Sequence, residues 1–394
     1  MRVFQSLSPR DIKELMRSIG VDPYGIRIMQ PKALNYSVKI DSVPCILANI
    51  LKQEMLSLGA DAAVARGALT GKAKKTGCLL IGNLSQFGLL KQKLKKQPFG
   101  MERLGLELAA SLENFCRSKF ILRAGSRRIS LGKRTCVMGI VNCTPDSFSG
   151  DGLYPGLRGI EEYAEKLVRE GADIIDVGGE SSRPGAGSVS VKEELKRTIP
   201  VIKRLARRIK APISIDTCKP EVARQALDSG AVIVNDITGL KDPLMAKTAA
   251  RHKAAVVVMH MQGDPRTMQK RPRYSSLIDE VIGSLAAAVR RAGECGVGED
   301  SIIVDPGIGF GKTLENNLEI LRRLPDFKVL GKPIMVGTSR KSFIGRILKA
   351  EPKDRILGTV SSCVLASALG ADIVRVHDVG QVKRALMVSD SILG

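Results

Sequence analysis

The strongest constraint on the fold is a pattern that repeats through residues 131–394. Short runs of apolar, largely β-branched residues occur eight times, at 137–141, 174–177, 213–215, 232–234, 256–259, 302–304, 334–336 and 373–374. Continuous apolar runs of this length are typical of parallel strands covered on both faces. Amphipathic helical stretches lie between most of them, for example at 160–170, 191–209 and 277–292. This alternation predicts an α/β fold, a (β/α)8 TIM barrel.

Polar residues directly follow several of the predicted strands. Asn142, Asp216, Asn235 and Asp305 each stand at the end of an apolar run. In a (β/α)8 barrel the carboxyl ends of the strands converge on one mouth, which holds the active site. A single Asp at such a position is commonly a helix N-cap, but carboxylate and amide groups on several strands favour a binding site.

Three further segments, at 178–187, 339–345 and 375–377, are candidates for a functional role. Residues 178–187 form a long glycine-rich loop, whose glycines permit close backbone approach. Residues 305–313 fail the spacing test for a phosphate-binding P-loop. Residues 339–345 combine cationic side chains with a predicted helix start, which favours anion binding. Arg375 and His377 point the same way at the end of the last strand and suit a phosphorylated group.

The length of 394 residues predicts two domains. We place an N-terminal α/β domain at 1–130 and the barrel at 131–394. In the first domain we expect strands at 36–40 and 79–82 and helices at 45–58, 84–96 and 101–117. No chemical constellation is found there, so its role is left open.

The net charge of +22 allows either a nucleic-acid partner or a basic surface around an anionic substrate. Few aromatic residues are present for base stacking, which makes nucleic acid the weaker alternative. The eight scattered cysteines include no C-x-x-C pair, so we interpret them as reduced core thiols. No apolar run suits a signal peptide or a membrane span, and we expect a cytoplasmic protein. His260 is interpreted as a satisfied histidine inside the barrel.

Several of these segments resemble the dihydropteroate synthase family of pterin-binding enzymes. The resemblance covers residues 136–380 and includes, in order, MGIVNCTPDSFS, GGESSRPGA, ISIDTCKPEVA, VNDI, MHMQGDPRTMQ, DPGIGFGKT, SRKSFIG and RVHDV. It implies a (β/α)8 barrel that condenses (7,8-dihydropterin-6-yl)methyl diphosphate with 4-aminobenzoate and releases diphosphate in the presence of Mg²⁺. The N-terminal region resembles extensions found on some members.

The resemblance also assigns roles to individual residues. Asp216 and Lys341 are the expected catalytic residues, and Asn142 is expected to face the magnesium ion. The pterin diphosphate site would comprise Asp176, Ser182, Asp216, Asn235, Met259, Asp305, Phe310, Lys341, Arg375, Val376 and His377. The 4-aminobenzoate site, the target of sulfonamide drugs, would comprise Phe148, Ser182, Arg183, Pro184 and Ser342.

Two positions depart from the common pattern of the family. Ser182 stands where many members carry Thr. The order Ser-Gly-Asp-Gly at 149–152 displaces the acidic residue of that loop to Asp151.

The charge-poor helix predicted at 356–370 is more apolar than a barrel's outer helix requires. We expect it to pack against a second subunit in a homodimer, or otherwise against the N-terminal domain.

Three functions remain open from the sequence. The first is the synthase, acting on 4-aminobenzoate or on a modified arylamine. The second is a methyltransferase built on a pterin-binding barrel, which the Ser-Arg-Pro-Gly and Ser-Arg-Lys-Ser segments disfavour. The third is a basic binding protein whose N-terminal domain contacts RNA or an acidic partner.

Overall fold

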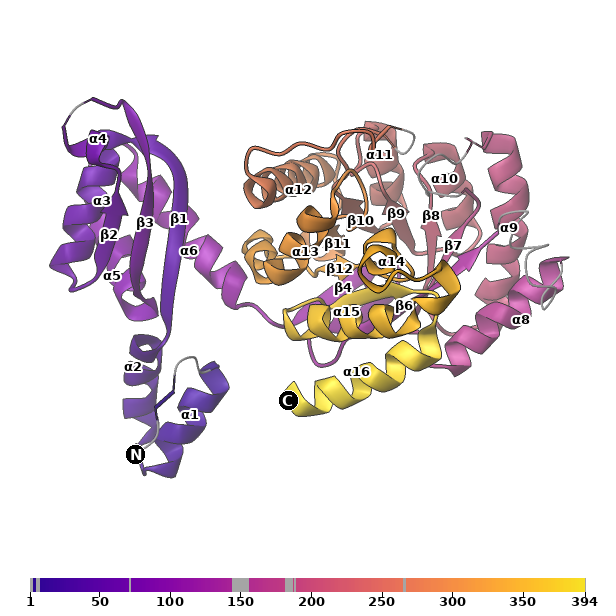
Figure 1. The fold of residues 1–394 in the computed structure, drawn as a ribbon, viewed down its shortest axis with the longest axis horizontal. Helices are drawn as coiled ribbons and strands as arrows, with labels where there is room; N and C mark the ends of the chain where they lie inside the picture. Colours follow the sequence, from indigo (N-terminus) through magenta and orange to yellow (C-terminus); the bar gives the residue numbers. More distant parts are fainter. Residues whose placement is uncertain are drawn as a thin grey trace. The chain divides into compact units, whose positions relative to one another are not determined.

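The computed structural model describes residues 3–4, 8–70, 72–143, 156–180, 187, 189–264 and 267–393 (Figure 1). Contacts divide the chain into two compact units, residues 1–113 and 114–394. The boundary therefore precedes the one expected at 130. The β-hairpin at 120–131 is part of the second unit.

The first unit is a three-stranded antiparallel sheet with the order β1-β3-β2, combined with helices. Its elements are α1 (Pro9–Ser18), α2 (Pro23–Ala33), β1 (Asn35–Pro44), α3 (Cys45–Ser57), β2 (Asp61–Val64), α4 (Arg66–Leu69), β3 (Lys75–Asn83), α5 (Leu84–Leu94) and the main part of α6 (Met101–Cys116). Strand β3 alternates exposed and buried residues, and its buried Cys78 and Leu80 share a core with Leu51 and Leu90. The two strands and three helices expected here are confirmed, while α1, α2, β2 and α4 were not foreseen.

The second unit contains eight parallel strands in the order β11-β10-β9-β8-β7-β6-β13-β12. A parallel bridge between Val304 and Ile334 joins the two ends of this order, so the sheet closes into a barrel. The strands are β6 (Cys136–Asn142), β7 (Ile174–Gly178), β8 (Ile213–Asp216), β9 (Ile233–Asp236), β10 (Ala255–Met259), β11 (Ile302–Asp305), β12 (Met335–Val336) and β13 (Ile373–Val376). All eight strands predicted from the apolar runs are confirmed.

Helices surround the strands of this barrel (Figure 1). They are α8 (Gly156–Arg169), α9 (Val191–Arg208), α10 (Pro220–Asp228), α11 (Pro243–Arg251), α12 (Leu277–Glu294), α13 (Leu314–Arg322), α14 (Ser342–Leu348), α15 (Ile356–Ala368) and α16 (Val379–Leu393), with short 3-10 turns η1 (Glu299–Ser301), η2 (Leu324–Leu330) and η3 (Pro352–Asp354). Their apolar faces and the outward strand residues form one large core. No helix within the described ranges is both long and apolar enough to cross a bilayer.

A hairpin of β4 (Phe120–Ala124) and β5 (Arg127–Leu131) packs against the inside of the barrel. Its Leu122 and Leu131 share a buried cluster with inward residues of the strands, among them Met138, Ile174 and Ile303. The hairpin therefore closes the amino-terminal end of the barrel. The opposite end, where the strands finish, is left for polar side chains.

Candidate active site

The strand register places the predicted polar residues around one mouth. Asn142 pairs with Gly178, Gly178 with Asp216, and Asp216 with Asn235, so these positions form one row across β6 to β9. Residues in such a row point to the same side of the sheet. Their neighbours in sequence, such as Ile215, pack outward into the helix core. The row therefore faces the barrel interior, as the sequence predicted.

Arg375 connects two of the carboxylates in this mouth. Its Nε donates a hydrogen bond of 2.6 Å to Oδ2 of Asp176, and its Nη2 donates one of 2.6 Å to Oδ2 of Asp216. Asn235 donates a third hydrogen bond, from Nδ2 to the same oxygen of Asp176, at 3.1 Å. The guanidinium group of Arg375, on β13, thus fixes one carboxylate from β7 and one from β8. Charge-assisted bonds of this kind define geometry as well as energy.

Asp176 and Asp216 differ in burial, in hydrogen bonding and in pKa. Asp176 is fully buried, and its Oδ1 has no hydrogen-bond partner among the described residues. A buried acceptor without a partner is costly, and a ligand donor would satisfy it. Burial raises the pKa of Asp216 to about 7, with Arg375 opposing the rise and Asp176 adding to it. Asp216 therefore titrates near neutral pH, which is common for groups that act in catalysis.

Asp305 and Lys341 form the opposite wall. Oδ1 of Asp305, at the end of β11, accepts a hydrogen bond of 2.7 Å from the backbone N–H of Gly307. Burial raises the pKa of Asp305, and Lys341 counteracts this rise. Burial also lowers the pKa of Lys341 to about 8. The Nζ of Lys341 donates to the carbonyl of Ile308 and lies 4.8 Å from the ring centroid of Phe310.

An apolar patch lies beside these charged groups. Met259, Met261 and Met268 are buried together, and Phe310 packs against them. Thioethers and an aromatic ring fit flat heterocycles, since sulfur contacts aromatic rings favourably. The mouth therefore offers polar acceptors and donors next to an apolar surface.

His377 is held at the rim by Ser339. The Nδ1 of His377 lies 3.0 Å from Oγ of Ser339, and the backbone N–H of His377 donates to the same oxygen at 3.2 Å. Next to it, Arg340 forms an ion pair of 2.6 Å with Asp378. These contacts join the segment before α14 to the end of β13, which are the two cationic segments that the sequence singled out.

The remaining predicted residues are placed as follows. Asn142 is exposed at the end of β6, and Ser342 is exposed as the first residue of α14. The side chain of Val376 points outward into the helix core, so it does not reach the mouth. The predicted residues Phe148, Ser182, Arg183 and Pro184 lie outside the described residues.

Two charged side chains near the mouth, the buried Lys312 and the half-buried Lys219, were not predicted. Lys312 contacts His260 beneath the apolar patch. Lys219 forms ion pairs with Glu180 and with the fully buried Glu194. A lysine that follows a strand-end loop was the available signal in both cases. Spacing alone does not distinguish such a lysine from a solvated one.

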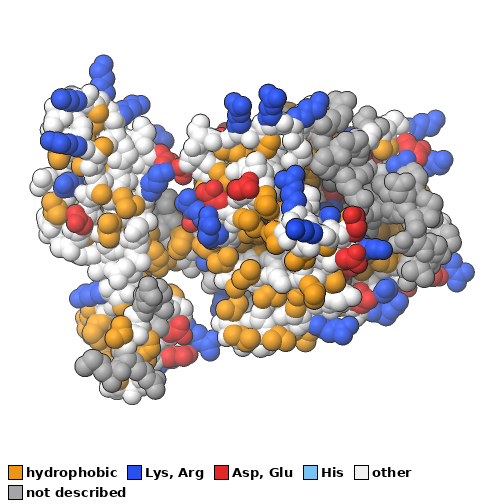
Figure 2. All heavy atoms as spheres, in the orientation of Figure 1, with side chains coloured by type: hydrophobic (Ala, Val, Ile, Leu, Met, Phe, Trp, Pro, Cys, Tyr) orange, Lys and Arg blue, Asp and Glu red, His pale blue; other side chains and the backbone are white. Residues whose placement is uncertain are grey.

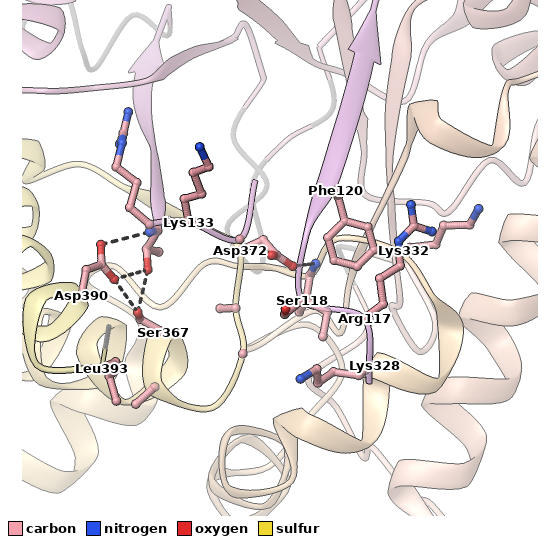
Figure 3. Close-up of a pocket in the computed structure, with 17 residues that line it drawn as sticks. Arg117, Ser118, Phe120, Lys133, Lys328, Lys332, Ser367, Asp372, Asp390 and Leu393 are labelled. Atoms are coloured by element: carbon pink, nitrogen blue, oxygen red, sulfur yellow. Dashed lines mark hydrogen bonds between the residues drawn. The ribbon is translucent and has the colours of Figure 1, made fainter. Parts of the chain in front are cut away.

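A separate cavity of about 270 Å³ lies at the amino-terminal end of the barrel (Figure 3). Cations line it, including Lys328 in the last turn of η2. Helix carboxyl ends favour such cations. Two other lining cations are paired, Arg134 with Asp173 and Lys332 with Glu299. These residues therefore have structural partners, and the cavity lies far from the strand ends that carry the polar mouth.

The family model for pterin binding enzymes matches residues 138–377 of the chain. The dihydropteroate synthase of Synechocystis is 50% identical over 273 residues, which are 69% of this chain and 94% of that protein. The chain belongs to the dihydropteroate synthase family. It is therefore a transferase of folate biosynthesis, and the barrel carries the activity.

The similarity to one relative extends beyond the barrel. A probable bifunctional folylpolyglutamate synthase/dihydropteroate synthase of Halobacterium salinarum is 39% identical over 384 residues, 97% of this chain. The match covers 46% of that protein, so the chain spans less than half of its length. The N-terminal unit of the chain therefore has a counterpart in that relative, although the Synechocystis match covers only 69% of the chain.

The fold is confirmed by a solved structure. The dihydropteroate synthase of Xanthomonas albilineans with 4-aminobenzoic acid superposes with a TM-score of 0.66 at 39% identity, covering 70% of this chain and 99% of that chain.

Proposed function

We propose that this enzyme joins (7,8-dihydropterin-6-yl)methyl diphosphate to 4-aminobenzoate. The observation that carries the proposal is the Arg375 bridge between Asp176 and Asp216, with Oδ1 of Asp176 unpartnered beside it. The aminopyrimidine edge of a pterin presents several N–H donors. Asp176, Asn235 and Asp305 present acceptors that suit this edge, and Lys341 is a donor for the pterin carbonyl.

The apolar patch would hold the faces of the pterin ring. Met259 is 5% exposed and Phe310 is partly buried, so both present surface at the edge of the mouth. We infer that the apolar patch and the polar groups of the mouth together select a fused heterocycle. Many ligands could bind to the apolar patch alone or to the polar groups alone.

The diphosphate would lie at the rim with Asn142, Arg375 and His377. Arg375 and His377 offer N–H groups to phosphate oxygens at the end of β13. Val376 contributes no side chain to this site, because it faces the helix core.

The rim offers one protein ligand for a magnesium ion. Within the described residues no group of three His, Cys, Asp or Glu side chains could hold a metal ion. Asn142 presents one amide oxygen there, and Mg²⁺ commonly takes one or two protein ligands together with phosphate oxygens and water. Asn142 would therefore hold the ion with the substrate, and the bound ion would neutralise charge on the leaving diphosphate.

The residues support a displacement without a covalent enzyme intermediate. We propose that the bond between the pterin methylene carbon and the diphosphate oxygen breaks first, with its electron pair leaving on the diphosphate. The carboxylate of Asp216 stabilises the resulting cationic methylene group. The amine nitrogen of 4-aminobenzoate then forms the new C–N bond to this methylene carbon and loses its extra proton to water. Asp216 suits this role because Arg375 already orients its carboxylate. With a pKa of about 7 the group is ionised in about half of the molecules at neutral pH and in nearly all of them at higher pH.

The 4-aminobenzoate site would be completed at the rim. Ser342 is exposed at the start of α14, where its hydroxyl and backbone N–H are available to a carboxylate. We propose that Phe148, Ser182, Arg183 and Pro184 shape the rest of this site, as the family resemblance implies.

We further propose that the barrel forms a homodimer. Figure 2 shows hydrophobic side chains gathered over α15 and α16. Leu357 and Leu365 on α15 are 75% and 61% exposed, and Met387 and Val388 on α16 are 60% and 62% exposed. A contiguous apolar face of this kind marks an interaction surface. A second copy of the same face is the partner that it fits.

A cytoplasmic location is supported by the cysteines. All eight are free thiols, five of them buried. Proteins that reside in oxidising compartments commonly pair such residues.

The decisive experiment is a condensation assay with the purified full chain. The pterin diphosphate is incubated with 4-aminobenzoate or with a modified arylamine, and the products are detected by mass spectrometry. We expect dihydropteroate from 4-aminobenzoate. Product from the modified arylamine alone would change the assigned substrate, and the absence of any condensed product would overturn the proposal.

A further inference from the structure

Lys312 is a buried lysine between the loops that follow β10 and β11. Lys312 is 3% exposed. The Nζ atom lies 2.9 Å from Nδ1 of His260, 3.0 Å from the carbonyl oxygen of Phe310 and 3.4 Å from the carbonyl oxygen of His260. These three acceptors match the three protons of an ammonium group. Within the described part of the chain, none of its hydrogen-bond partners is a carboxylate.

A buried cation without a carboxylate partner is costly. Burial lowers the pKa of Lys312 to about 7, and Lys341 lowers it further while Asp305 opposes this. A neutral side chain could connect the same loops at a smaller cost. A lysine at this position therefore differs from a neutral residue in the positive charge that it places beside the neighbouring ionisable groups.

Asp305 lies beside this cluster, because the backbone N–H of His260, whose ring and carbonyl oxygen contact Lys312, donates a hydrogen bond of 3.0 Å to the carbonyl oxygen of Asp305. Burial raises the pKa of Asp305, and Lys341, Lys312 and Arg375 all counteract that rise. Lys341 comes from the start of α14 and Arg375 from β13, whereas Lys312 comes from the loop after β11 itself. Of the three cations Lys312 is the most buried, and it is not among the residues expected to contact the pterin.

Lys312 also holds the apolar patch in place. It binds the carbonyl oxygen of Phe310, whose ring packs against Met259. Other contacts join the same two loops, since the hydroxyl of Tyr274 donates to the carbonyl of Gly311 at 2.8 Å. The two loops also pack closely at Gly307, where a Cβ atom would lie 2.0 Å from the carbonyl oxygen of His260.

We propose that Lys312 is a positioning residue for the pterin substrate, fixing Phe310 through its carbonyl group and placing a positive charge beside Asp305, which accepts the pterin's N–H groups. His260 serves as the neutral acceptor that holds the ammonium group. This inference rests on the proposed function and deepens it, because it assigns a role to a residue that does not touch the substrate.

The ionisation states of His260 and Lys312 determine the pH range in which Lys312 supports Asp305. Burial lowers the pKa of His260 to about 3, and the charges of Lys312 and Lys241 add to this, so His260 stays neutral between pH 5 and 9. Lys312 is protonated at the acid end of that range and loses its proton as the pH rises past about 7. Its charge therefore supports Asp305 at acid pH, and this support fades at alkaline pH.

The test compares Lys312→Met with wild type in the full chain between pH 5 and 9. We measure KM and kcat for both substrates and the Kd of the pterin diphosphate. At pH 6 we expect KM and Kd for the pterin diphosphate to rise about fivefold, with the acid limb of pterin binding (1/Kd against pH) moving up by about half a pH unit. The difference should shrink above pH 8, and KM for 4-aminobenzoate should stay within about twofold.

Two variants control for misfolding. Lys353→Met removes an exposed lysine on η3 and should match wild type throughout. His260→Gln keeps the charge of Lys312 and a neutral acceptor, so its acid limb should stay at the wild-type position even if its thermal stability falls.

An unchanged pterin Kd and acid limb in Lys312→Met would overturn the inference. So would a loss that is equal at every pH and is accompanied by a lower melting temperature, since that result indicates a structural role alone. A wild type that binds the pterin diphosphate without condensing it would refute the proposed reaction, while the Kd series would still decide the role of Lys312. If wild type binds no pterin, both proposals fail.

Discussion

Arg375 donates a 2.6 Å hydrogen bond from Nη2 to Oδ2 of Asp216, although the two residues lie 159 positions apart in the chain. The same guanidinium group binds Asp176 through Nε. Asp216 is therefore fixed in one orientation before substrate binds. A carboxylate that is already oriented stabilises a developing cation without further reorganisation.

Replacing Asp216 by Asn should reduce turnover much more than pterin binding. The amide keeps the size and one acceptor, but it lacks the negative charge that stabilises the cationic methylene group. We expect kcat to fall about a hundredfold or more. Steady-state assays and a binding titration with the pterin diphosphate measure the two effects. Full turnover in Asp216→Asn would show that this carboxylate has no role in the chemical step.

The same substitution should change how stability depends on pH. The pKa of Asp216 is raised to about 7 in the folded protein from an ordinary value of 3.8. Between these values the folded state holds a proton that the unfolded state has lost, so this group makes folding less favourable as the pH rises. Relative to wild type, Asp216→Asn should therefore gain stability from pH 4 to pH 8. Urea unfolding at both pH values measures the shift, and an unchanged or falling relative stability would contradict the assigned pKa.

The barrel could be predicted because its signals are local. Each strand from β6 to β13 is a short apolar run, and alternate residues along it, such as Ile215 and Asp216, face the helix core and the mouth. The hairpin β4–β5 was instead interpreted as a domain boundary, because Gly125, Ser126, Arg127, Arg128 and Gly132 cluster there. Strand β2, with the sequence DAAV, lacks the β-branched pattern that marks a strand.

The gathering of the strand-end residues at one mouth could be predicted from the sequence, but the contacts between them could not. Asp176 and Arg375 were both expected at the pterin site, yet their hydrogen bond joins residues 199 positions apart and no spacing rule indicates it. Val376, which the resemblance includes in that site, turns its side chain into the helix core, because a residue adjacent to Arg375 in a strand faces the opposite side. Lys312 was missed because its burial depends on the packing of two loops.

Gly307 should not tolerate a side chain. Its φ is +72°, and a Cβ there would lie 2.0 Å from the carbonyl oxygen of His260. We expect Gly307→Ala to lower the free energy of unfolding by about 3 kcal/mol, from strain and displacement of the loop. Gly283 on α12 is the control, because nothing lies within 4 Å of its Cβ position. Gly283→Ala should raise stability by about 0.5–1 kcal/mol. Denaturant titrations measure both changes, and equal stabilities would contradict the close approach.

Sulfonamide inhibition should be competitive with 4-aminobenzoate. Sulfamethoxazole presents an arylamine of the same shape, and the 4-aminobenzoate site is proposed to include Ser342 at the rim. Raising 4-aminobenzoate tenfold above its KM should therefore raise the apparent inhibition constant about elevenfold. Initial rates at several concentrations of both compounds measure this. Inhibition that does not depend on 4-aminobenzoate would place the drug elsewhere.

Leu365 tests the proposed dimer face. It is 61% exposed on α15, on the side of the helix opposite the buried Cys363 and Ala366. A glutamate at this position would place a charge in an apolar interface, where its desolvation has no compensating partner. We expect Leu365→Glu to convert a dimer to a monomer in sedimentation or light scattering.

Leu244→Glu provides the matched control, because Leu244 is 60% exposed on α11. The control should leave the dimer intact, since α11 lies outside the apolar face of α15 and α16. A monomeric wild type, or dissociation by both variants alike, would refute this interface. Both helices pack against the barrel rather than forming its strands, so the barrel fold of Leu365→Glu should persist by circular dichroism.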